Sequence, residues 1–302
     1  MTLIGCDWIA VDWGTTHLRA WAMAADGTML AEGRSGQGMA GLTREGFEPA
    51  LLSLITPWLG DRGMPVLACG MVGARQGWQE APYAEAPCDV LALHPVCVRT
   101  KDPRLQLRIV AGLCQRDPAD VMRGEETQIA GFLGGHAGFD GILCLPGTHS
   151  KWVRVETGQI VAFRTAMTGE LFGLLAGQSV LRLSLGDGWD AQVFQEAVAD
   201  ALARPEEFTA ALFSIRAEAL LQATDPAAAR SRLSGLLLGM ELAAMRSYWL
   251  SGPVTIIGAT NLAENYRAAL AVAGAAGMVR DGDAMTLAGL TAMYQAQGAQ
   301  WI

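Results

Sequence analysis

Short apolar runs separated by turn residues dominate the first half of the chain. Apolar runs of about four to eight residues, bounded by glycine, proline or aspartate, are typical of β-strands. Asp26–Gly27 is expected to be a turn between two strands, and Thr43 is expected to cap a helix that reaches about Trp58. This order predicts a mixed α/β unit. The expected strands are 8–13, 17–24, 28–34, 65–70, 90–99 and 105–111.

A second α/β unit is predicted to begin at about Gly141. Residues 187–250 have a helical pattern, in which Leu233, Leu237, Met240 and Ala244 form one apolar face that core packing explains. A strand then leads into a helix, and a last helix follows. The expected strands are 141–146, 151–156, 159–165 and 254–258, and the expected helices are 262–272 and 283–296.

The composition supports sizeable cores and excludes one class of partner. Hydrophobic residues make up 51% of the 302 residues and charged residues 17%, which argues against disorder. A chain of this length allows two domains of medium size. The net charge of -8 repels phosphate backbones and no basic stripe is present, so no nucleic-acid partner is expected.

The sequence also favours a cytoplasmic protein with no membrane partner. The start of the chain carries Asp7 and no basic region before an apolar core, so no secretory signal is expected. No window approaches the ~20 apolar residues that a membrane span needs. The cysteines have no Cys-x-x-Cys spacing and several lie in apolar runs, so free, buried thiols are expected. They stand at positions 6, 69, 88, 97, 114 and 144.

Two predicted hairpins offer groups that bind phosphate. In the first, Asp12 ends an apolar strand and the turn Gly14-Thr15-Thr16 follows. Such a turn presents backbone N–H groups and hydroxyls to an anion, and the aspartate beside it suits Mg²⁺ held through water. An ordinary Asp-Gly turn would look the same. The second hairpin spans residues 142–153, so the pair predicts two phosphate clamps facing each other across a cleft.

An acidic pair lies between these hairpins. Gly124 can end a loop, and Glu125 and Glu126 begin an apolar-patterned helix that runs through Phe132. The two side chains differ by about 100° around the helix, so only one can point straight into a cleft. Two acids at this place would also cap the helix and complement its dipole, and this is the alternative interpretation.

These features together resemble a known family. Hairpin, acidic helix start and second hairpin follow the order of the actin-like ATPase superfamily, and the runs 121–128 and 145–152 resemble those of 2-dehydro-3-deoxygalactonokinases. The resemblance covers nearly the whole chain. It implies the actin-like ATPase (ribonuclease H-like) α/β fold, with two domains, 1–138 and 139–302, flanking an ATP cleft. It further implies that the last helix packs back on the first domain, and that ATP and Mg²⁺ are cofactors.

The resemblance also implies catalytic roles. By analogy with the related exopolyphosphatases, whose helix also opens with Glu-Glu, Glu126 is expected to be the base, with Glu125 as the other candidate. Many carbohydrate kinases of the superfamily use an aspartate instead. Residues 145–148 lack the aspartate that actin and the chaperones carry before the glycines, so Asp12 is expected to be the main metal carboxylate.

The expected nucleotide contacts fall in the second half of the chain. In the second hairpin, Gly147 permits close approach, Thr148 and Ser150 supply hydroxyls, and Lys151 adds a positive charge. The end of the strand at 254–258 resembles the adenosine motif, although a plain strand-to-helix turn would look alike. Its expected adenosine-binding residues are Gly258, Ala259 and Asn261.

Two arginines are candidates for binding the carboxylate of an acidic sugar. Arg75 leaves a glycine-rich loop, with Gln76 beside it and Trp78 as an apolar wall. Arg164 is the other candidate, and either arginine could instead be solvated or paired with a nearby acid. His149 could donate to a phosphate or to the substrate, although a single histidine in a turn is more often a surface group.

The sequence therefore predicts an ATP- and Mg²⁺-dependent carbohydrate kinase. The resemblance implies phosphorylation of 2-dehydro-3-deoxy-D-galactonate at the 6-hydroxyl in galactonate catabolism. Two alternatives are a phosphatase or polyphosphate hydrolase of the same fold, and a non-catalytic ATP-binding regulator. The choice between galacto and gluco epimers and the oligomeric state, monomer or homodimer, are left open.

Overall fold

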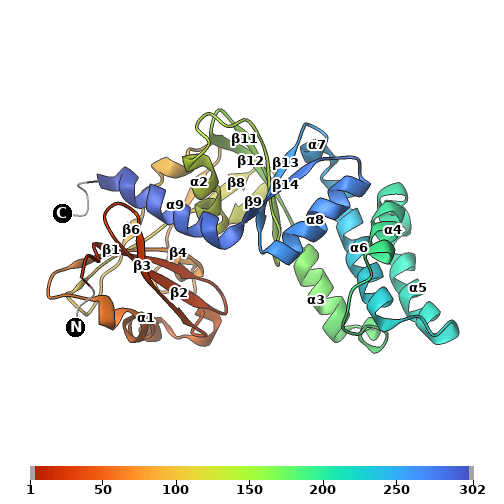
Figure 1. Ribbon diagram of the computed structural model, residues 1–302, viewed down its shortest axis with the longest axis horizontal. Coiled ribbons are helices and arrows are strands. Elements are labelled where there is room, and N and C mark those ends of the chain that lie inside the picture. The colour runs from red at the N-terminus through yellow and green to blue at the C-terminus, as the bar shows by residue number, and fades with distance from the viewer. Residues whose placement is uncertain (1–3, 299–302) are drawn as a thin grey trace. The chain divides into compact units, whose positions relative to one another are not determined.

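The computed structural model describes residues 4–298, which form two compact units (Figure 1). The first unit comprises residues 4–139, 156–162 and 283–298, and the second comprises residues 140–155 and 163–282. The chain thus returns to the first unit at Asp283, in its last helix. Within residues 4–298, no helix has both the length and the apolar character to cross a bilayer.

The first unit is built on a six-stranded sheet. Its strands are β1 (Trp8–Trp13), β2 (Leu18–Met23), β3 (Met29–Ser35), β4 (Met64–Gly70), β6 (Val96–Cys97) and β7 (Leu105–Ile109). They follow the order β3-β2-β1-β4-β7-β6. β4 runs parallel to both β1 and β7. The carboxyl ends of β1 and β4 therefore lie at one edge, with Asp12 beside Cys69.

The two faces of this sheet are covered by different helices (Figure 1). Successive side chains of a strand point to opposite faces. Trp13 is fully buried in a core with the helix α1 (Phe47–Ile55). Trp8 stacks on Tyr294 of the last helix, α9 (Gly282–Gln297), with the ring centroids 4.2 Å apart. Odd-numbered residues of β1 therefore face α1, and even-numbered residues face α9.

The helix α2 (Glu125–Gly134) packs on α9 through glycines. A Cβ atom on Gly131 would lie 2.0 Å from the carbonyl oxygen of Met285, and one on Gly289 would lie 1.9 Å from that of Thr127. Both distances are far below a van der Waals contact, so neither position has room for a side chain. The backbones of the two helices are in direct contact.

Two predicted elements of the first unit differ from the structure. A strand over 90–99 was expected, but Val90–Ala92 is a 3-10 turn and only Val96–Cys97 pairs with β7. Val90 and Val98 are buried, which explains the apolar run without a strand. The connection contains no α-helix among its residues, 71–104. The helix expected from Thr43 to Trp58 is α-helical only over α1, and Thr43 makes no side-chain cap bond.

A small three-stranded sheet in this unit was not predicted. Its strands are β5 (Tyr83–Glu85), β8 (Gly112–Arg116) and β9 (Ala119–Met122), in the order β5-β8-β9. The short strand β9 leads within two residues into α2. The small sheet therefore fixes where α2 begins.

The second sheet has five strands in the order β12-β11-β10-β13-β14. They are β10 (Gly141–Leu145), β11 (Ser150–Glu156), β12 (Gln159–Ala166), β13 (Val254–Gly258) and β14 (Gly277–Asp281). The first four agree with the predicted strands, and β14 was not expected. β10 and β13 are parallel, so their carboxyl ends lie at the same edge.

The remaining helices belong to the second unit. They are α3 (Thr168–Gln178), α4 (Ala191–Ala203), α5 (Phe208–Leu221), α6 (Pro226–Ala244), α7 (Arg246–Trp249) and α8 (Thr260–Val272). α4 and α6 pack closely, because Gly235 and Gly239 lie against the carbonyl oxygens of Phe194 and Val198. On the predicted apolar face of α6, Leu233 and Leu237 are buried but Ala244 is exposed.

The cysteines are free, as expected, but the prediction that they are buried is wrong for most of them. Cys69 and Cys144 are buried, whereas Cys97 is exposed and the other three are partly exposed. Cys97 lies in the two-residue strand β6 at the edge of its sheet, where alternation leaves every second side chain outside.

Candidate active site

Asp12 lies at the carboxyl end of β1 and points to the α9 face of the sheet. Arg19, directly opposite on β2, donates from Nη2 to Asp12 Oδ2 at 2.6 Å and from Nε at 3.2 Å. The Cys69 thiol lies 3.8 Å from Asp12 Oδ1. The Asp12 side chain is 21% exposed, so it is held on both sides and still open to solvent.

The first hairpin is closed by its own backbone. Gly14 N–H donates to the carbonyl of His17, and the carbonyls of Gly14 and Thr15 accept from Met39 and Ala40. The side chains of Thr15 and Thr16 are exposed. A pocket of about 680 Å³ collects Asp12, Gly14, Thr16 and Arg19. Most of the residues predicted at the first phosphate site therefore line one pocket.

Gly38 packs directly against this turn. A Cβ atom on Gly38 would lie 2.2 Å from the carbonyl carbon of Thr16. The segment around Gly38 therefore supports the hairpin from behind, and the sequence pattern did not point to it.

The acidic pair caps the start of α2. Gly124 N–H donates to Glu126 Oε2 at 2.7 Å, and Arg123 N–H donates to Glu125 Oε2 at 3.0 Å. Gly124 has φ 107°, a conformation that glycine tolerates best, so the chain turns sharply into the helix. Both acids make the cap that the alternative interpretation predicted. A cap and a catalytic role do not exclude each other.

Glu126 is fully buried, whereas Glu125 is half-exposed. Burial, followed by the charge of Glu125, raises the pKa of Glu126 to about 8, although Gly124 N–H and the charge of Arg123 act in the opposite direction. An acid with a pKa close to neutrality can take up and release a proton during a reaction. The environment of Glu126 is the one expected of a general base.

Asp12 and the start of α2 both lie beside Gly70. A Cβ atom on Gly124 would lie 3.6 Å from Gly70 Cα, and one on Gly70 would lie 3.4 Å from Asp12 Oδ1. Burial raises the pKa of the Cys69 thiol, and the charges of Asp12 and Glu126 raise it further. Asp12 and Glu126 therefore face the same small region beside Gly70, at the edge where β1 and β4 end.

Arg123 is a site residue that the sequence analysis did not assign. Its Nη2 donates to the carbonyl of Ala81 at 2.7 Å, and its guanidinium lies 4.5 Å from the ring centroid of Tyr83. Within residues 4–298, its buried Nε and Nη1 atoms have no hydrogen-bond partner. Its position two residues before the acidic pair was the one available signal.

The predicted acceptor loop separates into exposed and buried parts. The Arg75 side chain is 81% exposed and lies 3.6 Å from Glu80, and Gln76 is exposed as well. Trp78 is buried instead, with its ring centroid 6.2 Å from those of Trp13 and Phe47. Most of the Trp78 ring therefore packs in the α1 core.

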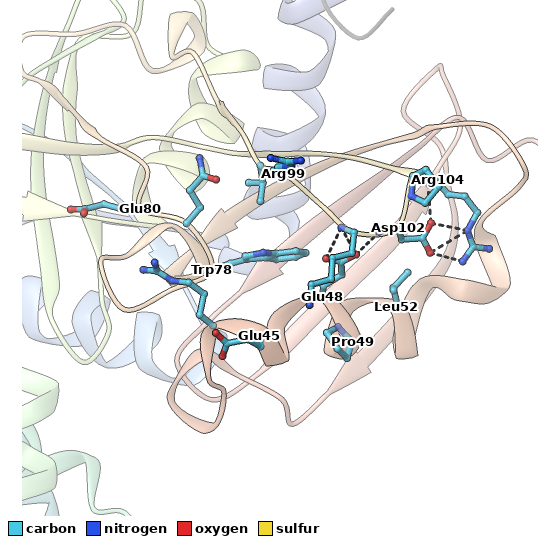
Figure 2. Close-up of a pocket in the computed structure, with 14 residues that line it drawn as sticks. Glu45, Glu48, Pro49, Leu52, Trp78, Glu80, Arg99, Asp102 and Arg104 are labelled. Atoms are coloured by element: carbon cyan, nitrogen blue, oxygen red, sulfur yellow. Dashed lines mark hydrogen bonds and ion pairs between the residues drawn. The ribbon is translucent and has the colours of Figure 1, made fainter.

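Trp78 lines a pocket of about 1030 Å³ on the α1 face (Figure 2). Arg44 and Arg99 also line it, and neither was singled out from the sequence. Because Asp12 points to the α9 face, this pocket does not contain the carboxylates of the candidate site. It is bounded by α1 and the loop 99–104.

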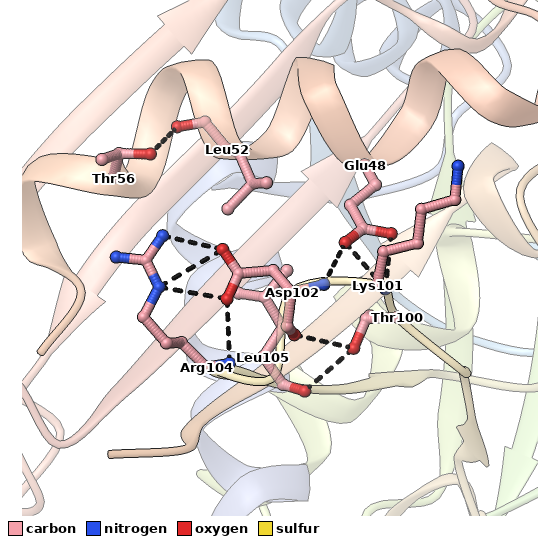
Figure 3. Close-up of polar contacts among 8 residues, drawn as sticks. All are labelled: Glu48, Leu52, Thr56, Thr100, Lys101, Asp102, Arg104 and Leu105. Carbon is pink, nitrogen blue, oxygen red and sulfur yellow. Dashed lines mark hydrogen bonds and ion pairs between the residues drawn. The ribbon is translucent and has the colours of Figure 1, made fainter. Parts of the chain in front are cut away.

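Figure 3 shows how that loop is fixed. The buried Glu48 carboxylate accepts hydrogen bonds from the backbone N–H groups of Lys101 and Asp102, at 2.7 to 3.0 Å. Asp102 in turn accepts from the backbone and the guanidinium of Arg104. The loop is therefore tied to α1 by the carboxylate of Glu48, which is largely buried.

The second hairpin rests on a buried polar network. Ser150 Oγ is hydrogen-bonded to Tyr266 Oη at 2.5 Å, and Tyr266 Oη donates to Glu241 Oε2 at 2.9 Å. Trp152 Nε1 donates to the other oxygen of Glu241 at 2.7 Å. Burial raises the pKa of Glu241 against these hydrogen bonds. Ser150 is fully buried, so its hydroxyl supports the hairpin from within.

The turn of the second hairpin contacts the start of α3. Thr148 and His149 are exposed, and Lys151 is buried. His149 Nε2 lies 2.5 Å from Glu170 Oε2 in the first turn of α3. A Cβ atom on Gly169 would lie 2.3 Å from the carbonyl oxygen of Gly147, so the turn and the helix start are in direct contact.

A smaller pocket lies in the second unit next to this turn. It has a volume of about 290 Å³ and is lined by Gly147, Phe172, Trp189, Arg230 and Asn265, among others. Apolar and aromatic walls with a few polar groups are typical of small-molecule sites. The guanidinium of Arg230 lies 4.9 Å from the centroid of the Phe172 ring.

The predicted adenosine motif adjoins the second hairpin. A Cβ atom on Gly258 would lie 3.5 Å from Pro146 Cδ, which is an ordinary contact. Ala259 and Asn261 are exposed at the start of α8. Arg164, on β12, is also exposed.

The residues around Asp12 fit a magnesium ion carried by a nucleotide. Among residues 4–298, no group of three or more His, Cys, Asp or Glu side chains is arranged to hold a metal ion. Magnesium bound to phosphates and water needs only one or two protein carboxylates. Asp12 supplies one, partly exposed and in the same pocket as Gly14 and Thr16.

Comparison with known proteins places the chain in a family. Residues 12–293 match the model of the 2-keto-3-deoxy-galactonokinase family. The chain belongs to this family. It has the actin-like ATPase fold expected from the resemblance, and the family is one of carbohydrate kinases that use ATP.

Relatives with full-length similarity carry the same activity in their names. One, from Rhizobium meliloti (strain 1021), is named a probable 2-dehydro-3-deoxygalactonokinase and is 38% identical over 95% of this chain and 96% of its own. The 2-dehydro-3-deoxygalactonokinase of Escherichia coli (strain K12) is 34% identical over 96% of this chain and 98% of its own.

Solved structures agree with this assignment. A crystal structure from Sinorhizobium meliloti, of a protein named for the same kinase activity, has a TM-score of 0.88 at 38% identity and covers 97% of both chains. Component A of the (R)-2-hydroxyglutaryl-CoA dehydratase of Acidaminococcus fermentans has a TM-score of 0.50 at 12% identity, covering 96% of this chain and 98% of its own. The second likeness concerns the fold alone.

Proposed function

We propose that this protein transfers the γ-phosphoryl group of ATP to the 6-hydroxyl of 2-dehydro-3-deoxy-D-galactonate, a step in galactonate breakdown. The observation that carries the proposal is the family match over residues 12–293, together with full-length relatives named for this activity. That match favours a kinase over the phosphatase and the non-catalytic regulator. The family match does not by itself assign roles to residues, so these are argued from the geometry.

Glu126 is proposed as the general base. Its raised pKa, about 8, makes the deprotonated carboxylate a stronger base than an ordinary glutamate for the proton of the attacking hydroxyl. Its two oxygens already meet Gly124 N–H and the hydroxyl of Thr127, so the carboxylate is fixed before substrate arrives. Glu125, more exposed and folded back on Arg123 N–H, remains the alternative.

Asp12 is proposed to hold the magnesium ion, through water, beside the first hairpin. A bound magnesium ion would neutralise charge that develops on the phosphoryl oxygens. The hydroxyls of Thr15 and Thr16 and the N–H groups of the turn are proposed to bind phosphate oxygens. Their exposure and the rigid closure of the turn support this assignment.

The second hairpin is proposed to bind the remaining ATP phosphates through Gly147, Thr148 and the charge of Lys151. Ser150 contributes by holding the hairpin through Tyr266. We assign the base and ribose of ATP to the pocket of about 290 Å³ that adjoins Gly147, next to the motif Gly258, Ala259 and Asn261. Asn265 is the polar side chain of that pocket on α8 closest in sequence to this motif.

The carboxylate of the sugar acid is proposed to bind Arg75, with Arg164 as the alternative. Arg75 extends from the loop that begins at Gly70, and Gly70 adjoins Asp12 and Gly124. Its side chain is exposed and, within residues 4–298, its one ion pair is the long contact with Glu80, so it is available to a ligand. His149 is paired with Glu170, and it would reach a substrate group only by leaving that partner.

The test is release of ADP by the purified protein with Mg·ATP, measured by a coupled assay with and without the sugar acid. A kinase releases ADP only when the acceptor is present. Equal release without acceptor would identify a hydrolase, and slow release in both cases would identify a regulator. A parallel assay with the gluco epimer determines the preference that the sequence left open.

A further inference from the structure

A chain of three charged groups leads from the last helix to Asp12. Arg19 lies between two carboxylates: its Nη2 and Nε donate to Asp12, and its Nη1 is ion-paired with Asp283. A guanidinium stays protonated in proteins. Arg19 is therefore a permanent cation shared by two acids.

Asp283 stands at the start of a well anchored helix. It is in the first turn of α9, one residue after the second unit ends. α9 is anchored on the first unit by the stack of Tyr294 on Trp8 and by the backbone contact of Gly289 with Thr127. A side chain at the start of so well anchored a helix can fix the position of its partner.

The negative charge that remains on Asp12 depends on how Arg19 divides its hydrogen bonds between Asp12 and Asp283. A cation that divides its hydrogen bonds between two carboxylates neutralises each of them only in part. Without Asp283, Arg19 would direct its whole fork at Asp12 and compete with a magnesium ion. Without Arg19, Asp12 would keep its full charge but lose the group that orients it.

We propose that Arg19 and Asp283 are positioning residues for the reaction: Arg19 orients the Asp12 carboxylate, and Asp283 draws part of the Arg19 charge away so that Asp12 can bind magnesium. The inference rests on the proposed magnesium role of Asp12. It assigns a function to the beginning of α9, about 270 residues further along the chain than Asp12.

The test uses two variants that should affect magnesium binding differently. Asp283→Asn should weaken binding of Mg·ADP, measured by titration calorimetry, by roughly 3- to 10-fold, because one partly exposed charge is lost. Arg19→Gln should leave Mg·ADP binding unchanged or tighten it. Both should lower kcat, since Asp12 is misplaced in both, with the KM for the sugar acid unchanged. Arg19→Lys should recover part of the lost kcat.

The controls separate this inference from a general loss of structure. Glu85→Gln breaks an exposed ion pair with Arg116 in the same unit and should change neither the Kd for Mg·ADP nor kcat. The inference is overturned if the Kd for Mg·ADP moves in the same direction in Asp283→Asn and Arg19→Gln. It is also overturned if neither Kd changes while both proteins melt earlier. Asp12→Asn is measured beside them: if it leaves the magnesium requirement intact, the proposed role of Asp12 fails first.

Discussion

At the scale of single residues, the site depends on where a charge is placed and on what surrounds it. Glu126 has no solvent exposure, and its neighbour Glu125 carries a like charge. Both conditions favour the protonated acid. The adjacent Arg123, with two buried nitrogen atoms that have no partner among residues 4–298, works against them. Glu126 is therefore poised between its two forms.

This balance predicts the pH dependence of the reaction. A base acts only when deprotonated, so kcat/KM should rise with pH through an apparent pKa near 8 and level off above it. Glu126→Gln should remove that rise and lower turnover by roughly 10²- to 10⁴-fold, with ATP binding nearly intact. Steady-state kinetics from pH 6 to 10 check this. If Glu125→Gln shows the large loss instead, Glu125 is the base.

Arg75 gives the second prediction at this scale. Arg75→Ala should raise the KM for the sugar acid by roughly tenfold or more and leave that for ATP nearly unchanged, because a charge-assisted pair with the carboxylate is lost. Each substrate is varied in turn. Arg62→Ala, at an exposed arginine of the same unit outside the candidate acceptor loop, serves as the matched variant. If the KM for the sugar acid is unchanged in Arg75→Ala, Arg164 is the better candidate for binding the carboxylate.

At the scale of elements, glycines set how closely α2 and α9 pack, and the buried Glu48 fixes the loop 99–104 on α1. α2 and α9 touch through Gly131 and Gly289, so the helix that carries Glu126 is supported by the last helix of the chain. The loop 99–104 is tied to α1 by Glu48. Each contact can be tested by adding or removing a few atoms.

Gly289→Ala should separate α2 from α9. The added methyl group would lie 1.9 Å from the carbonyl oxygen of Thr127, so the backbones must move apart, at a cost of about 1–3 kcal/mol or more. Thermal denaturation measures the loss, and turnover should fall because Glu126 moves with Thr127. Gly134→Ala on α2, where the nearest atom is 3.5 Å away, should be neutral or stabilising. Equal stability of both variants would contradict the close contact.

Glu48→Gln should destabilise the first unit by about 1–3 kcal/mol, because the loop hydrogen bonds lose their charged acceptor and an amide NH2 at the Oε2 position would face Lys101 N–H. Urea denaturation checks the value. Glu45→Gln, an exposed acid on the preceding turn, is the matched control and should have little effect. Since this loop is on the α1 face, the kinetic constants of the folded Glu48→Gln protein should be unchanged.

The same scale shows what could be predicted from the sequence. The two hairpins, α2 and the strand before α8 follow from local turns and periodicity, and the structure has them at the expected positions. The partners of their residues do not follow from local pattern. Arg19 with Asp283 and Ser150 with Glu241 are joined by tertiary contacts, and Trp78 is buried because Trp13 and Phe47 pack around it.

At the scale of the whole molecule, each unit carries one of the two proposed phosphate hairpins. If both bind the same ATP, the units should draw together when ATP and the acceptor are bound, which excludes water and suppresses wasteful hydrolysis. Small-angle scattering of the Glu126→Gln variant with both substrates should give a smaller radius of gyration than the protein alone. No change with both substrates bound would contradict closure.

The return of α9 to the first unit also bears on how the protein is made. Trp8, in the first strand, and Tyr294, in the last helix, are partners in one stack. A chain emerging from the ribosome cannot form that stack until Tyr294 has been synthesised, whereas residues 140–155 and 163–282 are by then available to fold among themselves. Such distant contacts are slow to form. The inserted unit should therefore be native first, while the site around Asp12 and Glu126 matures only after α9 has been synthesised.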